Sequence, residues 1–176
     1  RRFCEHEHFK RHLSIPSGAI KGGEFSHIHR VITKYYESKI PADKEFYLGR
    51  FSIRKGSNIY GVIFGSGHTK GIAKFLRVCW EIDPERGEAN FDIDGDSINE
   101  SAPFLFEEMN KSSKLTDFES SLESGLRNAK FRTDADVYLE SLRQGMLPKH
   151  GRNVLRRMIK EQVVRTKCGR QVRVSE

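Results

Sequence analysis

The sequence of 176 residues contains no apolar run that approaches the roughly 20 residues needed to cross a bilayer. Its basic start, which holds several histidines, also lacks the apolar stretch of a signal peptide. We therefore expect no membrane anchor and no membrane among the partners. The composition, with 36% hydrophobic and 31% charged residues, argues against collagen-like, low-complexity and disordered chains.

Cysteine is scarce, and Cys4, Cys79 and Cys168 are too far apart in the sequence to form a paired metal knuckle. Their odd number also argues against a disulfide framework. Both points favour a reducing, cytoplasmic setting. The chain opens with Arg1 rather than Met, which predicts a fragment from the interior of a longer protein.

Motifs of self-contained active sites are missing as well. The sequence has neither the Walker spacing nor a Gly-x-Ser-x-Gly nucleophile elbow, and no two carboxylates are placed convincingly as acid and base. We therefore expect no catalytic residue and no cofactor within this chain. Whether the protein is an enzyme stays open.

Two stretches resemble metal sites but depart from the required patterns. Residues 4–12 hold one cysteine and three histidines, without the second ligand pair of a zinc knuckle. The stretch from Asn90 begins like a calcium loop, with glycine at its sixth position, but its twelfth position is Ser101 where a bidentate Glu is needed. We therefore predict no metal site.

A glycine-rich loop, Gly65-Ser66-Gly67-His68, separates a predicted strand from a predicted helix. Backbone N–H groups at such a junction are able to bind an anion. Position 70 is Lys rather than the Gly that a dinucleotide-binding fingerprint requires. We keep these four residues as a candidate anion-binding or cleft loop.

The net charge of +7 is divided unevenly along the chain. Residues 1–80 hold 15 Lys or Arg against 6 Asp or Glu, residues 81–140 hold 6 against 16, and residues 141–176 hold 10 against 2. A terminal block this basic is typical of a surface that meets phosphate. It favours a nucleic-acid partner, and an acidic protein remains an alternative.

The first half of the sequence predicts a helix, a hairpin and a second helix. Apolar residues recur at helical spacing over Glu24–Ser38 and again over Ile72–Cys79. Between them, Phe46–Ile53 and Ile59–Phe64 are rich in aromatic and β-branched residues and flank a short turn, which is typical of a β-hairpin. Residues 81–114 are acidic and contain two prolines, so we expect an irregular linker there.

The second half carries start and stop signals of three helices. Residues 116–119 fit a capping box at a helix start, and residues 133–136 are the start signal of a second helix. Gly145 suits the left-handed conformation that ends a helix. Pro148 suits the first turn of the next one.

The predicted helix Pro148–Glu161 has one apolar and one basic face. Its basic and polar residues follow offsets of 0, 3, 4, 7, 8 and 11 from Lys149. Two short alternating strands, Val163–Thr166 and Gln171–Val174, come directly after it. Three helices followed by a basic hairpin predict a winged helix-turn-helix.

A helix of this kind fits the major groove of DNA, and the hairpin would reach adjacent phosphates. Arg152 and Asn153 are the predicted base readers, and the remaining cations are predicted phosphate contacts. The candidate nucleic-acid-binding residues are Lys149, His150, Arg152, Asn153, Arg156, Arg157, Lys160, Arg165, Lys167, Arg170 and Arg173. A basic face that merely docks another protein is the alternative.

Several stretches together resemble the later part of the three-Cys-motif partner proteins (TcmP). They are Asn58-Ile-Tyr-Gly-Val-Ile-Phe-Gly-Ser-Gly-His68, Gly71, Lys74-Phe75-Leu76, Cys79-Trp80, Gly87-Glu-Ala-Asn-Phe-Asp92, Asp136-Val-Tyr138 to Gly145, His150 and Val154-Leu155. The stretches from Asp136 onward are similar to the helix-turn-helix tail of that family.

The resemblance implies a larger bacterial protein with a Rossmann-like, methyltransferase-like region. Residues 1–83 would be the C-terminal part of that α/β domain, residues 84–114 an acidic linker, and residues 115–176 a winged helix-turn-helix domain. S-adenosylmethionine would be expected only of the longer parent, and a protein with a three-Cys motif would be a further partner. The oligomeric state is open.

The leading hypothesis is therefore a module of a larger protein that binds double-stranded DNA. One alternative is the C-terminal half of a methyltransferase-like enzyme that modifies nucleic acids. Another is a protein-interaction tail.

Overall fold

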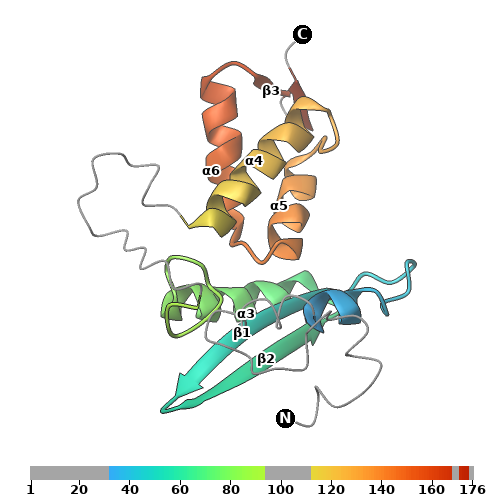
Figure 1. Cartoon of the computed structure of the whole chain (residues 1–176). Helices are drawn as coiled ribbons and strands as arrows, with labels where there is room; N and C mark the ends of the chain where they lie inside the picture. The colour runs from blue at the N-terminus through green and yellow to red at the C-terminus, as the bar shows by residue number, and fades with distance from the viewer. Residues whose placement is uncertain (1–31, 94–111, 168–170, 175–176) are drawn as a thin grey trace, which may run out of the picture.

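The computed structural model describes residues 32–93, 112–167 and 171–174. After a helical turn over residues 32–37, the elements are β1 (Tyr47–Lys55), β2 (Asn58–Ser66), α3 (Thr69–Ile82), α4 (Ser113–Arg127), α5 (Asp134–Arg143), α6 (Pro148–Lys160), β3 (Val164–Lys167) and β4 (Gln171–Val174). Figure 1 shows α3 between the β1–β2 hairpin and the helices α4, α5 and α6. The fold is mixed α/β, as predicted.

The predicted first hairpin is confirmed. β1 and β2 pair antiparallel from Tyr47 opposite Ser66 to Lys55 opposite Asn58. Gly56, in the two-residue turn between them, has a φ of 60°, a conformation that glycine adopts without steric cost. The strands carry side chains alternately to two faces, and Phe51 is buried on the face that meets α3.

The helix α3 packs through the apolar stripe that its sequence period predicts. Ile72, Leu76, Cys79 and Trp80 are all buried. Phe75 stacks on Phe64 of β2, with ring centroids 4.8 Å apart. The side of α3 that carries Phe75 therefore covers one face of the hairpin, and the adjacent side, with Leu76 and Trp80, packs against the other helices.

The described part of the expected acidic linker, residues 84–93, contains no helix or strand, as predicted, but it packs against the hairpin. The backbone N–H of Ser52 in β1 donates to the carbonyl of Glu88 at 2.7 Å, and the carbonyl of Ser52 accepts from Asn90 at 3.1 Å. The Asp83 carboxylate orders the same turn by accepting hydrogen bonds from backbone N–H groups between residues 85 and 89. Residues 84–93 thus line the edge of β1, and the expectation of a linker fails for them because these contacts are not local in sequence.

The helix starts follow the sequence signals in two cases of three. The predicted start at Thr133 is confirmed, and there the Thr133 hydroxyl and the Asp136 carboxylate form a capping box. Pro148 occupies the first turn of α6 as predicted. The predicted start at Thr116 is wrong, because the Ser112 hydroxyl accepts from the N–H of Leu115 and begins α4 earlier.

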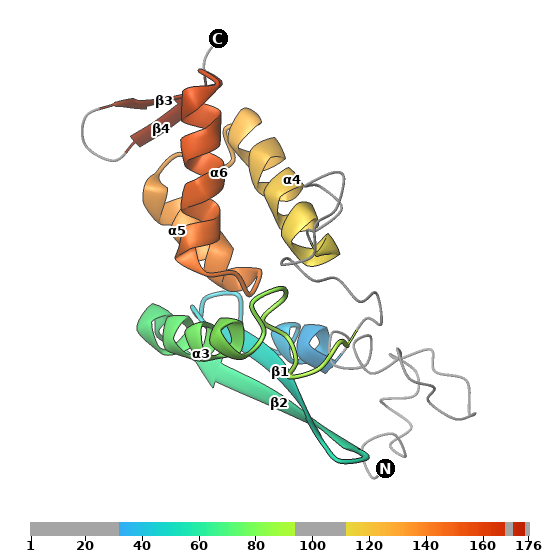
Figure 2. The ribbon, with the colours of Figure 1, turned by 90° about the vertical axis from the view of Figure 1, so that its left-hand side faces the viewer.

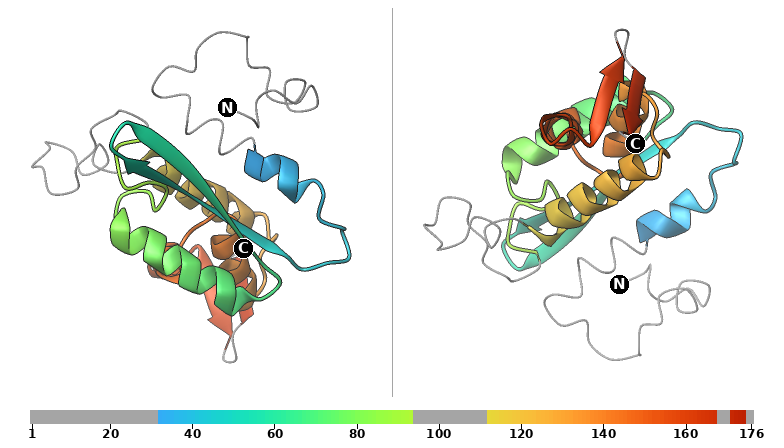
Figure 3. Two further views of the ribbon diagram at one scale, coloured as in Figure 1. Left: turned by 90° about the horizontal axis from the view of Figure 1, so that it is seen from below. Right: turned by 90° about the horizontal axis from the view of Figure 1, so that it is seen from above.

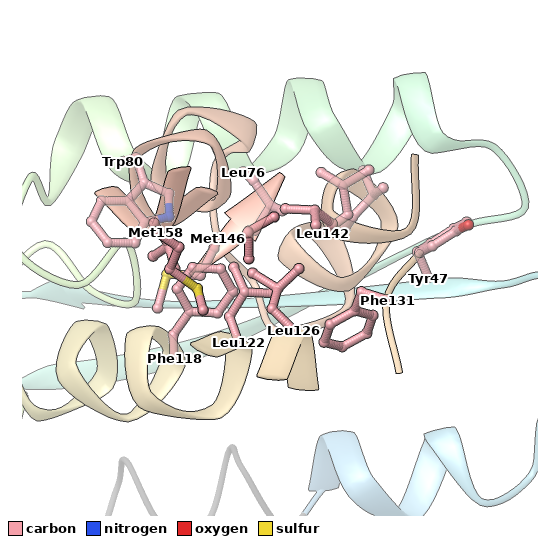
Figure 4. Close-up of a cluster of buried hydrophobic side chains, with 14 residues drawn as sticks. Tyr47, Leu76, Trp80, Phe118, Leu122, Leu126, Phe131, Leu142, Met146 and Met158 are labelled. Atoms are coloured by element: carbon pink, nitrogen blue, oxygen red, sulfur yellow. The ribbon is translucent and has the colours of Figure 1, made fainter. Parts of the chain in front are cut away.

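One cluster of buried side chains joins α3 to α4, α5 and α6. Trp80 and Leu76 of α3 face Phe118, Met146 and Met158 (Figure 4). The indole N–H of Trp80 also donates to the carbonyl of Gly145 at 3.0 Å. Gly145 has a φ of 71°, as predicted for the residue that ends a helix. Both predicted folding units therefore share one hydrophobic core.

Several predictions concern residues outside the described ranges. They include the cysteine and histidines of residues 4–12, the first part of the predicted helix Glu24–Ser38, and the calcium-like stretch beyond Ile93. Within residues 32–37 the predicted helix is present. In the part of the chain that the structure describes, no helix is long and apolar enough to span a bilayer.

Candidate functional site

The helix α6 separates its side chains into a buried and an exposed set, as its sequence period predicts. Val154 and Met158 are buried against the other helices. On the opposite side the basic and polar residues are exposed, namely Lys149, Arg152, Asn153, Arg156 and Lys160. We call these five residues the α6 basic face. Within the described residues its four cations form no ion pair with a carboxylate, so their charge is directed at solvent.

The structure places His150 in the core instead of on this face. The residue is only 9% exposed, and its ring meets Trp80 edge to face, with centroids 4.3 Å apart. Burial lowers the pKa of His150 to about 4, with Lys149 and Lys114 adding repulsion. The imidazole is therefore neutral at pH 7, and it packs α6 onto α3 rather than contacting a ligand.

Arg157 also differs from its predicted role. Its guanidinium lies 3.3 Å from the Glu119 carboxylate and also donates to Glu123, both on α4. These contacts hold α6 beside α4, and the two carboxylates neutralise the charge of Arg157 within the protein. We therefore do not count Arg157 in the α6 basic face.

The predicted second hairpin is confirmed by its backbone. β3 and β4 pair antiparallel, with Arg165 opposite Arg173 and Lys167 opposite Gln171. Figure 2 shows this hairpin beside the end of α6 that is remote from α3. Val164, at the start of β3, is buried in the shared core and fixes the hairpin to the helices. Arg170 lies outside the described residues.

The candidate anion-binding loop has a role within the fold. The N–H of His68 donates to the Ser66 hydroxyl at 3.0 Å, and that hydroxyl donates to the carbonyl of His68 at 2.8 Å. One backbone donor that the anion hypothesis needs is thus occupied. Gly65 and Gly67 line a mainly apolar hollow together with Phe46. The arrangement fits a cleft border better than a phosphate site.

A buried ionic cluster escaped prediction from the sequence. The Glu88 carboxylate lies 2.8 Å from the Arg50 guanidinium and 3.1 Å from the Lys114 ammonium. Lys114 also donates to the carbonyl of Arg86 at 2.8 Å. Burial lowers the pKa of Lys114, while Glu88 favours its charged form. These residues are far apart in sequence, so no local pattern reveals them, and the cluster links β1 to α4.

Other reactive chemistry is sparse in the described ranges. No group of three His, Cys, Asp or Glu side chains could hold a metal ion there. The Cys79 thiol is buried in α3, and burial raises its pKa to about 11, so it stays protonated at neutral pH.

Comparison with known proteins adds no relative. No protein-family model, no curated protein and no solved structure matches this chain. The resemblance to three-Cys-motif partner proteins therefore stays a prediction, and any function has to be argued from the α6 basic face and its surroundings.

Proposed function

We propose that residues 112–174 form a DNA-binding module of the winged helix-turn-helix kind. The observation that carries the proposal is the α6 basic face, whose cations are exposed and free of carboxylate partners among the described residues. Cations left unpaired along one side of a helix are suited to phosphate and to the edges of guanine.

The surrounding elements support the same proposal. α5 and α6 are consecutive packed helices joined by a short turn at Gly145, and an antiparallel hairpin follows α6 directly. In winged helix-turn-helix proteins the second helix of such a pair enters the major groove and the hairpin touches neighbouring phosphate. Arg165 and Arg173 are register partners in that hairpin and would add phosphate contacts.

The roles within the α6 basic face differ. Asn153 and Arg152 would read base edges, because amide and guanidinium groups form paired hydrogen bonds to adenine and guanine. Lys149, Arg156 and Lys160 would bind phosphates, which gives affinity without sequence information. The resemblance noted above would make this module the targeting arm of a larger protein.

The test is a fluorescence-anisotropy titration of the full chain with about two helical turns of duplex DNA at several salt concentrations. For the unaltered chain we expect log K to fall linearly with log salt. The Arg152→Ala/Arg156→Ala variant should bind more weakly, and its salt slope should be smaller by about one, because only Arg156 of the two is assigned to a phosphate.

The matched control is Lys70→Ala/Lys74→Ala, which removes two exposed cations from α3 instead. It changes the net charge by the same amount but leaves the α6 basic face intact. Equal loss of affinity in both variants would show nonspecific attraction and contradict the proposal. No binding at low salt would also contradict it and would favour an acidic protein partner.

A further inference from the structure

The outer edge of β2 is unpaired among the residues that the structure describes. At the opposite edge of the sheet, Ser52 of β1 directs its N–H and carbonyl away from β2 toward Glu88 and Asn90. In an antiparallel pair, the backbone N–H and carbonyl groups of successive residues point alternately to the two edges of a strand. Because even-numbered Ser52 points away from β2, the odd-numbered residues of β1 form the hydrogen bonds to β2. By register their partners in β2 are even-numbered. The outward groups of β2 therefore belong to Ile59, Gly61, Ile63 and Gly65.

β2 has none of the features that usually prevent an edge strand from pairing. Its nine residues contain no charged residue and no proline, and its register with β1 runs without a bulge. Another strand is able to add along its whole length.

Besides its buried apolar stripe, the helix α3 carries a second apolar stripe on the side that faces the free edge of β2. Gly71, Phe75, Val78 and Ile82 follow offsets of 0, 4, 7 and 11, which is the spacing of a helix–helix seam. The stacking of Phe75 on Phe64 directs this stripe toward β2. Val78 and Ile82, beyond that contact, are 53% and 52% exposed.

β2 contributes a matching exposed row. Tyr60 and Val62 lie on the same face as Phe64, because side chains alternate along a strand. They are 52% and 37% exposed. Figure 3 shows α3 running alongside the hairpin, so the row on the strand and the stripe on the helix extend in the same direction.

We propose that β2 pairs antiparallel with β2 of a second copy of this chain, about a two-fold axis at Val62. The two hairpins then form one sheet of four strands, with both α3 helices on the same face. Val62 is the middle residue of β2, so this register pairs the whole strand. It also places outward-facing Gly61 opposite outward-facing Ile63 of the other copy, as backbone hydrogen bonding requires.

The spacing of strands in a sheet places the α3 helices of the two copies at contact distance. Neighbouring strands are about 4.8 Å apart. α3 lies over β1 and β2 together, so the symmetry-related helix is two strand spacings away, or about 10 Å. Packed helices are separated by roughly 8–10 Å. The apolar stripe of one α3 would therefore meet the stripe of the other.

A second copy explains more of this surface than a foreign strand does. A foreign strand would satisfy the edge of β2 but would leave Val78 and Ile82 exposed. A symmetric partner covers both, since the same patch faces itself in a two-fold interface.

Cysteine cross-linking tests the register in the full chain. In Val62→Cys the two introduced thiols face each other across the axis, and we expect mild oxidation to give a covalent dimer. In the matched control, Tyr60→Cys, the thiols are separated by several residues along the strands and should not link. The unaltered chain, which contains Cys4, Cys79 and Cys168, reports any linkage through native thiols. Equal linkage of both variants, or none in Val62→Cys, would overturn the proposal.

Light scattering after size exclusion tests the helix seam. Val78→Glu is expected to raise the dissociation constant of the dimer by at least about tenfold, because it places two like charges in a desolvated contact. Lys70→Gln changes the net charge equally on the exposed side of α3 and should leave the dimer intact. Val78 is exposed in one copy, so its replacement should not disturb folding, which circular dichroism checks. A monomeric unaltered chain, or a dimer unaffected by Val78→Glu, would refute the inference.

Discussion

Replacing His150 with Phe should remove much of the acid sensitivity of this fold between pH 6.5 and pH 4. Phe retains a ring against Trp80 but has no titratable nitrogen. In the native protein the Nδ1 atom of His150 is buried without a hydrogen-bond partner among the described residues, so the replacement leaves no buried donor or acceptor unpaired there.

The size of the change in unfolding free energy follows from the pKa of His150 in the folded and in the unfolded chain. Burial lowers that pKa from 6.5 to about 4, with repulsion from Lys149 and Lys114 acting in the same direction and Glu119 opposing it. The unfolded chain therefore binds the proton first as the pH falls. The stabilisation due to the neutral imidazole is complete above pH 6.5 and is lost as the pH falls toward 4. The total loss is about 3 kcal/mol, of which about 2 kcal/mol is gone near pH 5.

Urea denaturation at a series of pH values measures this loss. Trp80 is the only tryptophan in the sequence and contacts His150, so its fluorescence reports on the region concerned. The difference in unfolding free energy between the native chain and His150→Phe should grow as the pH falls. The control His68→Gln, at an exposed histidine, should keep the acid sensitivity of the native chain. Parallel pH curves for the native chain and His150→Phe would refute the reasoning.

Two further predictions concern packing. Glu88→Gln should lower the unfolding free energy by about 3 kcal/mol, because Lys114 is left as a buried charge without its carboxylate. The same change at exposed Glu81 should cost less than about 1 kcal/mol, and similar losses in urea titrations of the two variants would contradict the interpretation. Gly125→Ala should destabilise by about 1–3 kcal/mol, because its methyl group would overlap the Phe131 ring. An unchanged melting temperature would contradict that overlap.

Local signals were sufficient for much of the fold. The helix start at Thr133, the glycine at 145 and the proline at 148 each depend on a few neighbouring residues, and the structure has all three features as predicted. The first hairpin follows from alternating residues around a short turn, although its strands extend to Lys55 and Asn58, beyond the predicted ends at Ile53 and Ile59. Each of these features is formed by residues that are close together along the chain, which is why a single sequence reveals them.

The misjudged positions depend on distant partners. Helical period places His150 and Arg157 at the border between the two faces of α6, and only Trp80 and the carboxylates of α4 decide where their side chains lie. Residues 84–93 resemble a linker by composition, yet their backbone groups bond to Ser52 in β1. Tertiary contacts of this kind override composition.

The shared core has a consequence for how the molecule opens. Because Trp80 and Leu76 pack against side chains of α4 and α6, neither the hairpin layer nor the helical bundle buries its apolar surface alone. Amide groups in β1 and in α6 should then exchange with deuterium mainly through one common global opening. A ligand that binds only the folded α6 basic face reduces the population of that open state. Hydrogen exchange would therefore slow in β1, far from the bound ligand, without any change in the structure of the hairpin.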